Sequence, residues 1–421
     1  MISAIGAIIG LLLAIVLILR KVSPVYSLLL GAVAGGLAGG MGIESTVSNI
    51  ISGVKDITPA IVRIITAGVL SGVLIKTGAA ASIARTIVER LGSRHIFLAL
   101  ALSTMLLTAV GVFVDVAVIT VAPIAILIAE RQGVSKFKML LALVGGGKCG
   151  NIISPNPNTI IAAENFSAPL SSVMMANIGA AILGLLITVY LIIPLMPKGQ
   201  AETVAANRER GSEERLPSFI ASIAGPLVVI LLLALRPVVG ISVDPLIALP
   251  IGGVVGIIAT GRWNKTAESL TFGLEKMSVV AVLLVSTGAI AGIIKASSLT
   301  DLLISFMGSG ESAGIVMAPL SGAVMSAATA STTAGATIAS ASFAPTILSA
   351  GVAALWGAAM VNAGATVLDH LPHGSFFHAT GGAVEMGIKE RLRLIPYESL
   401  VGLVLSVLSL VTYLTFGRGG A

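Results

Sequence analysis

Long stretches of uninterrupted apolar residues are the dominant pattern along the chain. Residues 2–19, 176–195 and 351–368 contain no charged side chain. Each stretch approaches the ~20 apolar residues that a membrane-spanning helix needs. The ~10-residue segments of alternating polarity that are typical of a transmembrane β-barrel are absent from the sequence. The pattern therefore predicts an all-α polytopic membrane protein.

The composition excludes a water-soluble globule. Of the 421 residues, 56% are hydrophobic and 10% are charged, and the mean hydropathy is +1.04; soluble domains carry roughly 25% charged residues. The net charge of +6 comes from bases in short loops, which set membrane orientation and do not indicate nucleic-acid binding. The single cysteine, Cys149, excludes an internal disulfide and a multi-cysteine metal site. We expect 2–19 to be a first span and not a signal peptide, because a basic segment and a cleavage site are missing.

The chain divides into two similar halves. The polar stretch 198–217 (KGQAETVAANRERGSEERLP) is too charged to enter lipid, and we expect it to be a cytoplasmic linker between a first repeat, 1–197, and a second, 218–421. The strings AGVLSGVLIK (67–76) and TGAIAGIIK (287–295) match closely. An offset of 220 positions also aligns three pairs of glycines: Gly53 with Gly273, Gly68 with Gly288 and Gly72 with Gly292. A shared order of this length indicates an internal repeat.

The Lys and Arg residues predict that the two repeats face opposite ways. We expect spans in the first repeat near 3–19, 24–42, 57–75, 139–165 and 172–196. The apolar stretch 96–130 has basic residues at both ends, so both ends are expected on the cytoplasmic side, as in a re-entrant hairpin. Its counterpart in the second repeat is 312–347. With the N-terminus outside, most of the 25 Lys and Arg residues face the cytoplasm and the repeats have inverted topology, which is a plan of secondary transporters.

A proline-rich segment interrupts the predicted span 139–165. In NIISPNPNT (151–159), two prolines remove backbone donors and cannot lie in a continuous helix, so we expect the helix to break there. The hydroxyl and amide groups at the break belong to Ser154, Asn156, Asn158 and Thr159. A half-helix that begins after the break would present its positive N-terminus to an anionic substrate. The alternative is a structural kink that the asparagines cap.

Two polar clusters lie in the second repeat. SAATASTTAGATIAS (326–340), within the hairpin 312–347, holds small hydroxyl residues that either surround a ligand or let helices pack closely: Thr329, Ser331, Thr332 and Thr333. VNAGATVLDHLPHGSFFH (361–378) follows an apolar run and predicts a second broken helix over 351–377. Its candidate site residues are Asn362, Thr366, Asp369 and His370, whereas His373 and His378 also fit an ordinary helix end.

Few ionisable residues lie within the apolar segments. Asp115 is in the hairpin 96–130; an isolated carboxylate at membrane depth costs ~2.5–3.5 kcal/mol and usually faces a polar cavity, unless it caps a half-helix. Asp369 and His370 indicate proton handling, because histidine titrates near neutrality. Lys148 has three open interpretations: it neutralises a carboxylate substrate, pairs with Asp115 or Asp369, or reaches the cytoplasmic interface. The sequence has no P-loop and no HExxH motif, so uphill transport would draw on an ion gradient.

Four strings at these clusters resemble the gluconate permease family, which are gluconate:proton symporters of the ion transporter superfamily. The strings are VFVDVAVITVAP (112–123), ISPNPNTIIAA (153–163), SAAT (326–329) and GATVLDH (364–370). The resemblance implies a homodimer in which a mobile transport domain moves against a scaffold domain by an elevator-type displacement. It also implies a substrate held between two hairpin tips and two unwound helices, which here are Asp115, 154–159, 329–333 and 366–370. The chain departs from the family at two of these elements: the family typically has glutamate where Asp115 stands, and Pro-Pro-His-Pro where this chain has SPNP (154–157).

The expected function is import of a small organic anion by proton symport, with a gluconate-like sugar acid or a glycerate-like hydroxy-carboxylate as substrate. Asp115, Asp369 and His370 are the candidates for proton coupling. We expect a multi-pass protein in the plasma (inner) membrane of a bacterium or archaeon, without a cofactor, and not an enzyme. Sodium coupling with the same architecture is the alternative. The opposed hairpins disfavour a channel or an intramembrane enzyme, because a fixed pore needs no pair of gates.

Overall fold

The computed structural model describes residues 3–132, 134–197, 215–241, 243–299, 301–302, 305 and 311–417. The elements that these residues form are all helices, which confirms the predicted all-α class. Within these described ranges, six helical segments are long and apolar enough to cross a membrane: Ile43–Lys76, Leu170–Leu195, Phe219–Arg236, Trp263–Lys295, Glu311–Thr329 and Ile388–Gly417. They agree with the predicted polytopic architecture.

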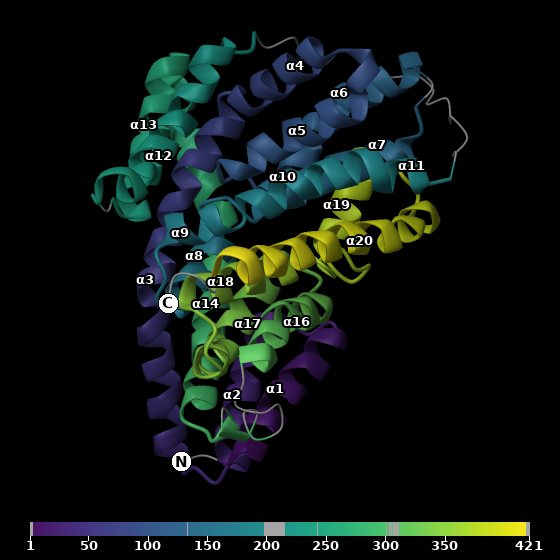
Figure 1. Cartoon of the computed structure of the whole chain (residues 1–421). Coiled ribbons are helices and arrows are strands. Elements are labelled where there is room, and N and C mark those ends of the chain that lie inside the picture. The colour runs from purple at the N-terminus through teal and green to yellow at the C-terminus, as the bar shows by residue number, and fades with distance from the viewer. Residues whose placement is uncertain are drawn as a thin grey trace.

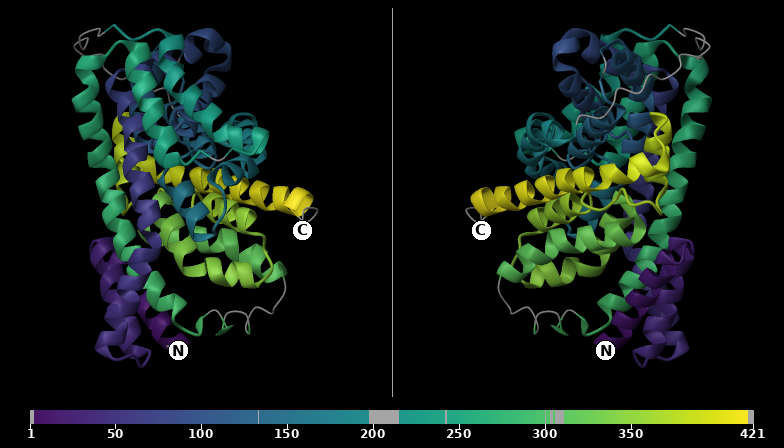
Figure 2. Two further views of the ribbon diagram at one scale, coloured as in Figure 1. Left: turned by 90° about the vertical axis from the view of Figure 1, so that its left-hand side faces the viewer. Right: turned by 90° about the vertical axis from the view of Figure 1, so that its right-hand side faces the viewer.

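Two long helices, α3 and α14, lie side by side and form the centre of a scaffold (Figure 2). α1 and α2 pack at one end of this pair, and α12 and α13 pack at the other (Figure 1). The scaffold helices are α1 (Ala4–Leu19), α2 (Pro24–Ala38), α3 (Ile43–Lys76), α12 (Phe219–Val239), α13 (Pro245–Thr260) and α14 (Thr266–Lys295). Because α2 packs on α14 while α13 packs on α3, each half of the chain contributes its short pair to the long helix of the other half.

Glycines from the predicted repeat bring the backbones of α3 and α14 together. A Cβ atom on Gly68 would lie 2.7 Å from the carbonyl oxygen of Gly273, and a Cβ atom on Gly288 would lie 2.8 Å from that of Gly53. Since Gly53 aligns with Gly273 and Gly68 aligns with Gly288, these two contacts are one contact repeated by a two-fold relation. The helices run antiparallel, and the two-fold axis passes between them, as inverted repeats require.

The second body lies beside the scaffold and is built from two helical hairpins and two interrupted helices; we call it the hairpin body. Its helices are α5 (Ile96–Ala109) with α6 (Val114–Gln132), α7 (Lys136–Asn151) with α8 (Pro157–Asn165), α16 (Glu311–Thr329) with α17 (Thr332–Ser349), and α18 (Ala354–Gly364) with α19 (Ser375–Ala383). The hairpin turns contain Gly111 and Ala330, both with positive φ. The hairpins occupy the stretches predicted as 96–130 and 312–347, and the interruptions fall within 139–165 and 351–377.

The remaining helices connect or cover these two bodies. α10 and α20 cross the hairpin body next to each other (Figure 1), and α4 packs between α5 and α12. The elements are α4 (Ala79–Leu91), α9 (Leu170–Ala176), α10 (Ile178–Ile187), α11 (Ile193–Leu195) and α20 (Ile388–Thr412), with the short turns η1 (Ser93–His95), η2 (Thr188–Ile192), η3 (Trp263–Lys265) and η4 (Tyr413–Gly417).

Two details differ from the sequence-based expectations or lie beyond them. The third span was expected to begin near 57, but α3 begins at Ile43, because Gly53 and Ile57 lie on a buried face that continues through the polar stretch toward α14. Of the linker 198–217, residues 198–214 lie outside the described part of the chain.

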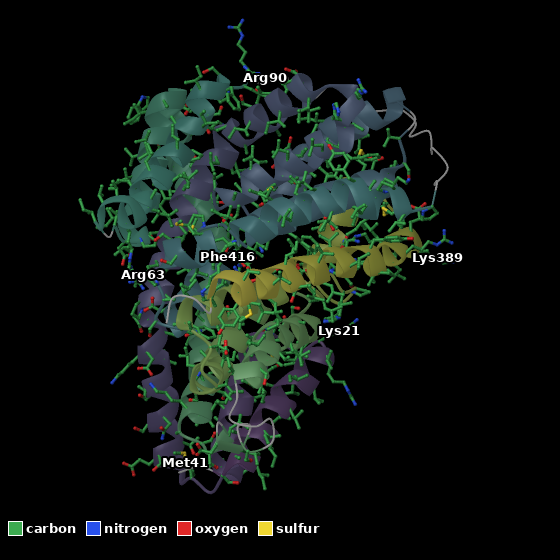
Figure 3. The ribbon with its side chains drawn as sticks, viewed as in Figure 1. Lys21, Met41, Arg63, Arg90, Lys389 and Phe416 are labelled. Carbon is green, nitrogen blue, oxygen red and sulfur yellow. The ribbon has the colours of Figure 1, made fainter. Side chains whose placement is uncertain are left out.

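The orientation of the protein in the membrane stays a prediction. Two of the basic residues expected on the cytoplasmic side, Arg90 and Lys389, project from the surface (Figure 3).

Candidate substrate site

The tips of both hairpins open onto one cavity of about 470 Å³ between the hairpin body and α14. The walls come from both repeats, so Asp115 of the first repeat shares this cavity with both polar clusters of the second repeat. The lining consists of Phe113, Val114, Asp115, Asn151, Ala330, Ser331, Thr332, Thr333, Ala334, Asp369, Ser375 and Phe376 from the hairpin body, and Glu275, Lys276, Val279, Val280 and Leu283 from α14.

Three helices begin at this cavity. α6 starts at Val114, α17 at Thr332 and α19 at Ser375, and the first turn of each contributes to the lining. The Ser331 hydroxyl caps α17 by accepting a hydrogen bond from the backbone N–H of Ala334 at 3.3 Å. Helix N-termini carry partial positive charge and unpaired N–H groups. Three of them around one cavity favour an anion inside it.

Asp115 is the ionisable group of the hairpin body that faces this cavity without a partner. It lies in the first turn of α6 and is half-buried, and its carboxylate makes no hydrogen bond or ion pair with any residue that the structure describes. The helix N-terminus stabilises the carboxylate when it is ionised. Asp115 is therefore available to a ligand in the cavity.

Lys148, in contrast, is fully buried behind the cavity and holds Asp369 in place. Its ammonium donates to Asp369 Oδ1 at 2.6 Å and to the carbonyl of Thr366 at 2.6 Å. The other carboxylate oxygen of Asp369 accepts a hydrogen bond from the Thr332 hydroxyl at the tip of the second hairpin. Lys148 thus joins α7 of the first repeat to the unwound segment and the hairpin tip of the second. Of the three interpretations of Lys148, the pair with Asp369 is the one that the structure shows.

His370 and a second buried ion pair extend this network away from the cavity. Lys148 Nζ and Asp369 Oδ1 each lie 3.0 Å from His370 Nδ1. The Ile395 carbonyl and the Ser399 hydroxyl each lie 3.1 Å from His370 Nε2. Arg391 and Glu398 form the second pair, with Nη1 2.7 Å from Oε1. Both ion pairs are buried and each is neutral as a unit.

At the two helix breaks, the amide groups of Asn156, Asn158 and Asn362 bond to neighbouring polar groups and do not line the cavity. Asn158 Nδ2 donates to Asn362 Oδ1 at 2.7 Å, and Asn362 Nδ2 donates to Thr159 Oγ1 at 3.1 Å. Asn156 Oδ1 caps α8 by accepting from the Thr159 N–H at 3.2 Å. The structural alternative of asparagines that cap a kink therefore describes Asn156, while Asn158 and Asn362 join α8 to α18.

The structure brings five of the predicted site residues to the cavity: Asp115, Ser331, Thr332, Thr333 and Asp369. The others are buried in the layer behind it or lie outside its lining: Ser154, Asn156, Asn158, Thr159, Thr329, Asn362, Thr366 and His370. The sequence interpretation missed Asn151, Glu275 and Lys276 in the lining, and Arg391 and Glu398 in the network. Glu398 could have been found from its charge within an apolar segment. The sequence around Glu275 and Lys276 gives no local sign that this face of α14 lines a cavity.

Comparisons with known proteins point to a membrane transporter, which agrees with the all-helical fold. A profile described as GntP family permease matches residues 1–417. The chain belongs to the GntP permease family. It is 54% identical to an uncharacterized transporter of Haemophilus influenzae over 99% of each chain, and 25% identical to the gluconate permease of Pseudomonas aeruginosa over 75% of this chain and 76% of that one. Its fold is similar to that of the Alcanivorax borkumensis YdaH transporter, with a TM-score of 0.64, 16% identity and 89% of each chain covered.

Membership in the GntP family confirms the family resemblance and makes the protein a multi-pass transporter. A permease moves small molecules across a membrane, which agrees with the prediction that the chain is not an enzyme. The YdaH structure, described as having an unusual topology, supports the fold of this GntP permease at the level of architecture alone.

Proposed function

We propose that this GntP permease imports a small hydroxy-carboxylate together with a proton. One observation carries the proposal: three helix N-termini and the unpaired carboxylate of Asp115 face the same cavity. The helix N-termini bind the substrate carboxylate, and the hydroxyls of Ser331, Thr332 and Thr333 bind substrate oxygens. The name of the Pseudomonas aeruginosa gluconate permease supports a sugar acid as substrate. We also propose a homodimer in a bacterial inner membrane whose hairpin body moves, elevator-like, along the scaffold.

The charges around the cavity support Asp115 as the proton carrier in preference to Asp369 or His370. Lys148 already compensates the charge of Asp369, and Arg391 compensates that of Glu398. A substrate carboxylate that enters the cavity therefore meets the uncompensated carboxylate of Asp115. Two carboxylates held close together share a proton more readily than either one binds it alone. Binding of substrate and proton then favour each other, which is the requirement for symport.

Uptake into proteoliposomes tests this function directly. Labelled gluconate and glycerate are offered with an inward proton gradient and, separately, with an inward sodium gradient. Accumulation with the proton gradient alone supports the proposal. Accumulation that needs sodium overturns proton coupling, and the absence of uptake of any hydroxy-carboxylate under both gradients overturns the substrate class.

Asp115→Asn is expected to abolish proton-driven accumulation while substrate exchange continues. Asparagine keeps the size and the hydrogen-bonding groups of the side chain but cannot carry a proton, and exchange of external for internal substrate needs no net proton movement. Uptake and counterflow are measured on the same proteoliposomes. Asp56→Asn is the matched control, since Asp56 pairs with Lys295 on the exposed side of the scaffold, and both activities should survive. Loss of counterflow in Asp115→Asn would remove Asp115 from the coupling role.

A further inference from the structure

The hairpin body is two-fold related within itself but does not sit symmetrically on the scaffold. α17 packs along α14, and α8 packs against α3. The repeat counterparts of these helices are α6 and α19, which pack on each other and have no comparable packing on α3 or α14 in the described part of the chain. Their N-termini instead face α14 across the substrate cavity. The proposed elevator-type motion expects an asymmetric placement of this kind at each of its two end positions.

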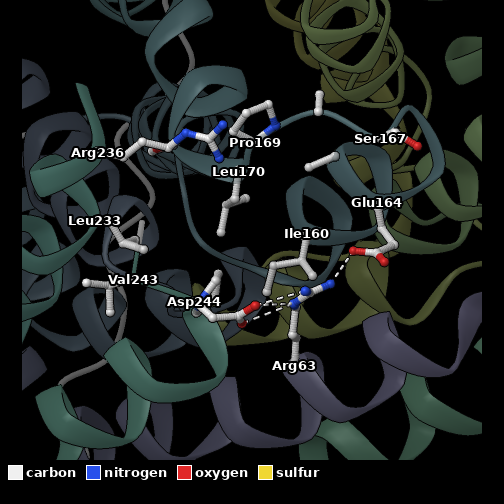
Figure 4. A pocket seen from close by; sticks show the side chains of 14 residues that line it. Arg63, Ile160, Glu164, Ser167, Pro169, Leu170, Leu233, Arg236, Val243 and Asp244 are labelled. Atoms are coloured by element: carbon white, nitrogen blue, oxygen red, sulfur yellow. Dashed lines mark hydrogen bonds and ion pairs between the residues drawn. The ribbon is translucent and has the colours of Figure 1, made fainter. Parts of the chain in front are cut away.

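An ion-pair cluster lies where α8 meets the scaffold (Figure 4). Arg63 on α3 donates to Asp244, the N-cap residue of α13, with Nη2 2.8 Å and Nε 3.1 Å from the two carboxylate oxygens. Its remaining Nη1 donates to Glu164, which is on α8 of the hairpin body. The cluster borders a cavity of about 300 Å³ that Arg236 and Ser171 also line.

The two carboxylates that bind Arg63 have different roles because they belong to different bodies. Asp244 and Arg63 are both on the scaffold, so their contact persists when the hairpin body moves. The Arg63 guanidinium also holds the pKa of the Asp244 carboxyl below its usual range, so Asp244 stays ionised and keeps Arg63 oriented. Glu164 moves with α8, so its contact with Arg63 depends on where the hairpin body docks.

We propose that the Arg63–Glu164 ion pair is a clasp that holds the hairpin body in the docking position seen here and opens when the body moves. The clasp rests on the proposed elevator-type motion. The repeat alignment places Leu283 at the position equivalent to Arg63, so the opposite docking position has no equivalent ion pair. The clasp therefore stabilises one end position selectively, and its strength sets the balance between the two.

Thiol labelling of the purified protein tests the clasp without any knowledge of the substrate. Cys149→Ala removes the native cysteine, and Ser171→Cys places a probe beside the clasp. Glu164→Gln is expected to raise the rate of maleimide labelling about two- to fivefold, the shift that loss of a partly exposed ion pair allows. Arg63→Gln should raise the labelling rate to a similar extent. The double variant should add little, because both substitutions remove the same contact between the two bodies, the Arg63–Glu164 ion pair.

A matched control separates the clasp from a general loss of charge. Glu268→Gln removes ion pairs to Lys76 and Lys265 that lie within the scaffold, so labelling should stay at the unsubstituted rate. The proposal is overturned if Glu164→Gln labels no faster than the unsubstituted protein, if Glu268→Gln labels equally fast, or if the two clasp substitutions act additively. None of these readouts depends on uptake, so failure of the clasp is distinguishable from failure of the proposed transport function.

Discussion

Lys148→Met is expected to abolish transport and to lower the free energy of unfolding by about 3–5 kcal/mol, the effect of removing one partner of a buried ion pair. Lys148 is fully buried, and Asp369 is almost so. Without the ammonium, the Asp369 carboxylate is left charged and uncompensated in the cavity wall, and the Thr366 carbonyl loses a donor. Thr332, which donates to Asp369, is then no longer held by a fixed partner.

Thermal unfolding in detergent, followed by the fluorescence of Trp263 and Trp356, measures the stability part of this prediction. Lys148→Met combined with Asp369→Asn removes both charges and should recover more than half of the lost stability, but not transport. Lys295→Met is the matched control. It breaks an exposed pair with Asp56 whose side chains are 70% and 56% accessible, so the expected change is below about 1 kcal/mol. An unchanged unfolding temperature in Lys148→Met would show that the pair contributes nothing to the fold.

The elements of the fold were predictable because each has a local cause. Two prolines only two residues apart, Pro155 and Pro157, cannot both lie in a continuous helix, and α7 ends at Asn151 while α8 begins at Pro157. Basic residues at both ends of 96–130 suggested a hairpin, and a helical hairpin with a turn at Gly111 is found there. The predicted start of α3 was wrong. The segment before residue 57 is polar in sequence, but Thr46, Gly53 and Ile57 form a buried face that only the packing of α14 makes apparent.

The site was less predictable, because cavity lining depends on how helices from two repeats are rotated against each other. Asn158 and Asp115 are both polar residues in apolar segments, so the sequence treats them alike. In the fold, Asn158 bonds to Asn362 in the layer behind the cavity, and Asp115 faces the cavity. The pairing of Lys148 with Asp369 was one of three open choices, since a contact across more than 200 residues leaves no local trace.

The repeated glycines were likewise visible in the sequence, but their role in packing became clear only from the fold. The sequence aligned Gly68 with Gly288 as equivalent positions of an internal repeat, without a role for either residue. In the structure both lie in the contact between α3 and α14. The close approach of two backbones fixes the two-fold relation of the scaffold, and it makes a single added methyl group costly at these positions.

Gly68→Ala is accordingly expected to destabilise the protein by about 1–3 kcal/mol, as overpacking does in a well-packed core. The added Cβ would lie 2.7 Å from the Gly273 carbonyl oxygen and 2.9 Å from Met277 Cγ, so the two helices must separate. Gly179→Ala is the matched control, because Gly179 is also helical but has no atom within 4 Å of an added Cβ. There the alanine should raise stability by roughly 0.4–1 kcal/mol through the unfolded chain. Unfolding temperatures that move in opposite directions for the two variants would support close packing of α3 on α14 as the basis of the scaffold. Equal changes of the unfolding temperature in the two variants would mean that the contact between α3 and α14 has room for an added methyl group. Close packing of these glycines would then not be the cause of the two-fold relation.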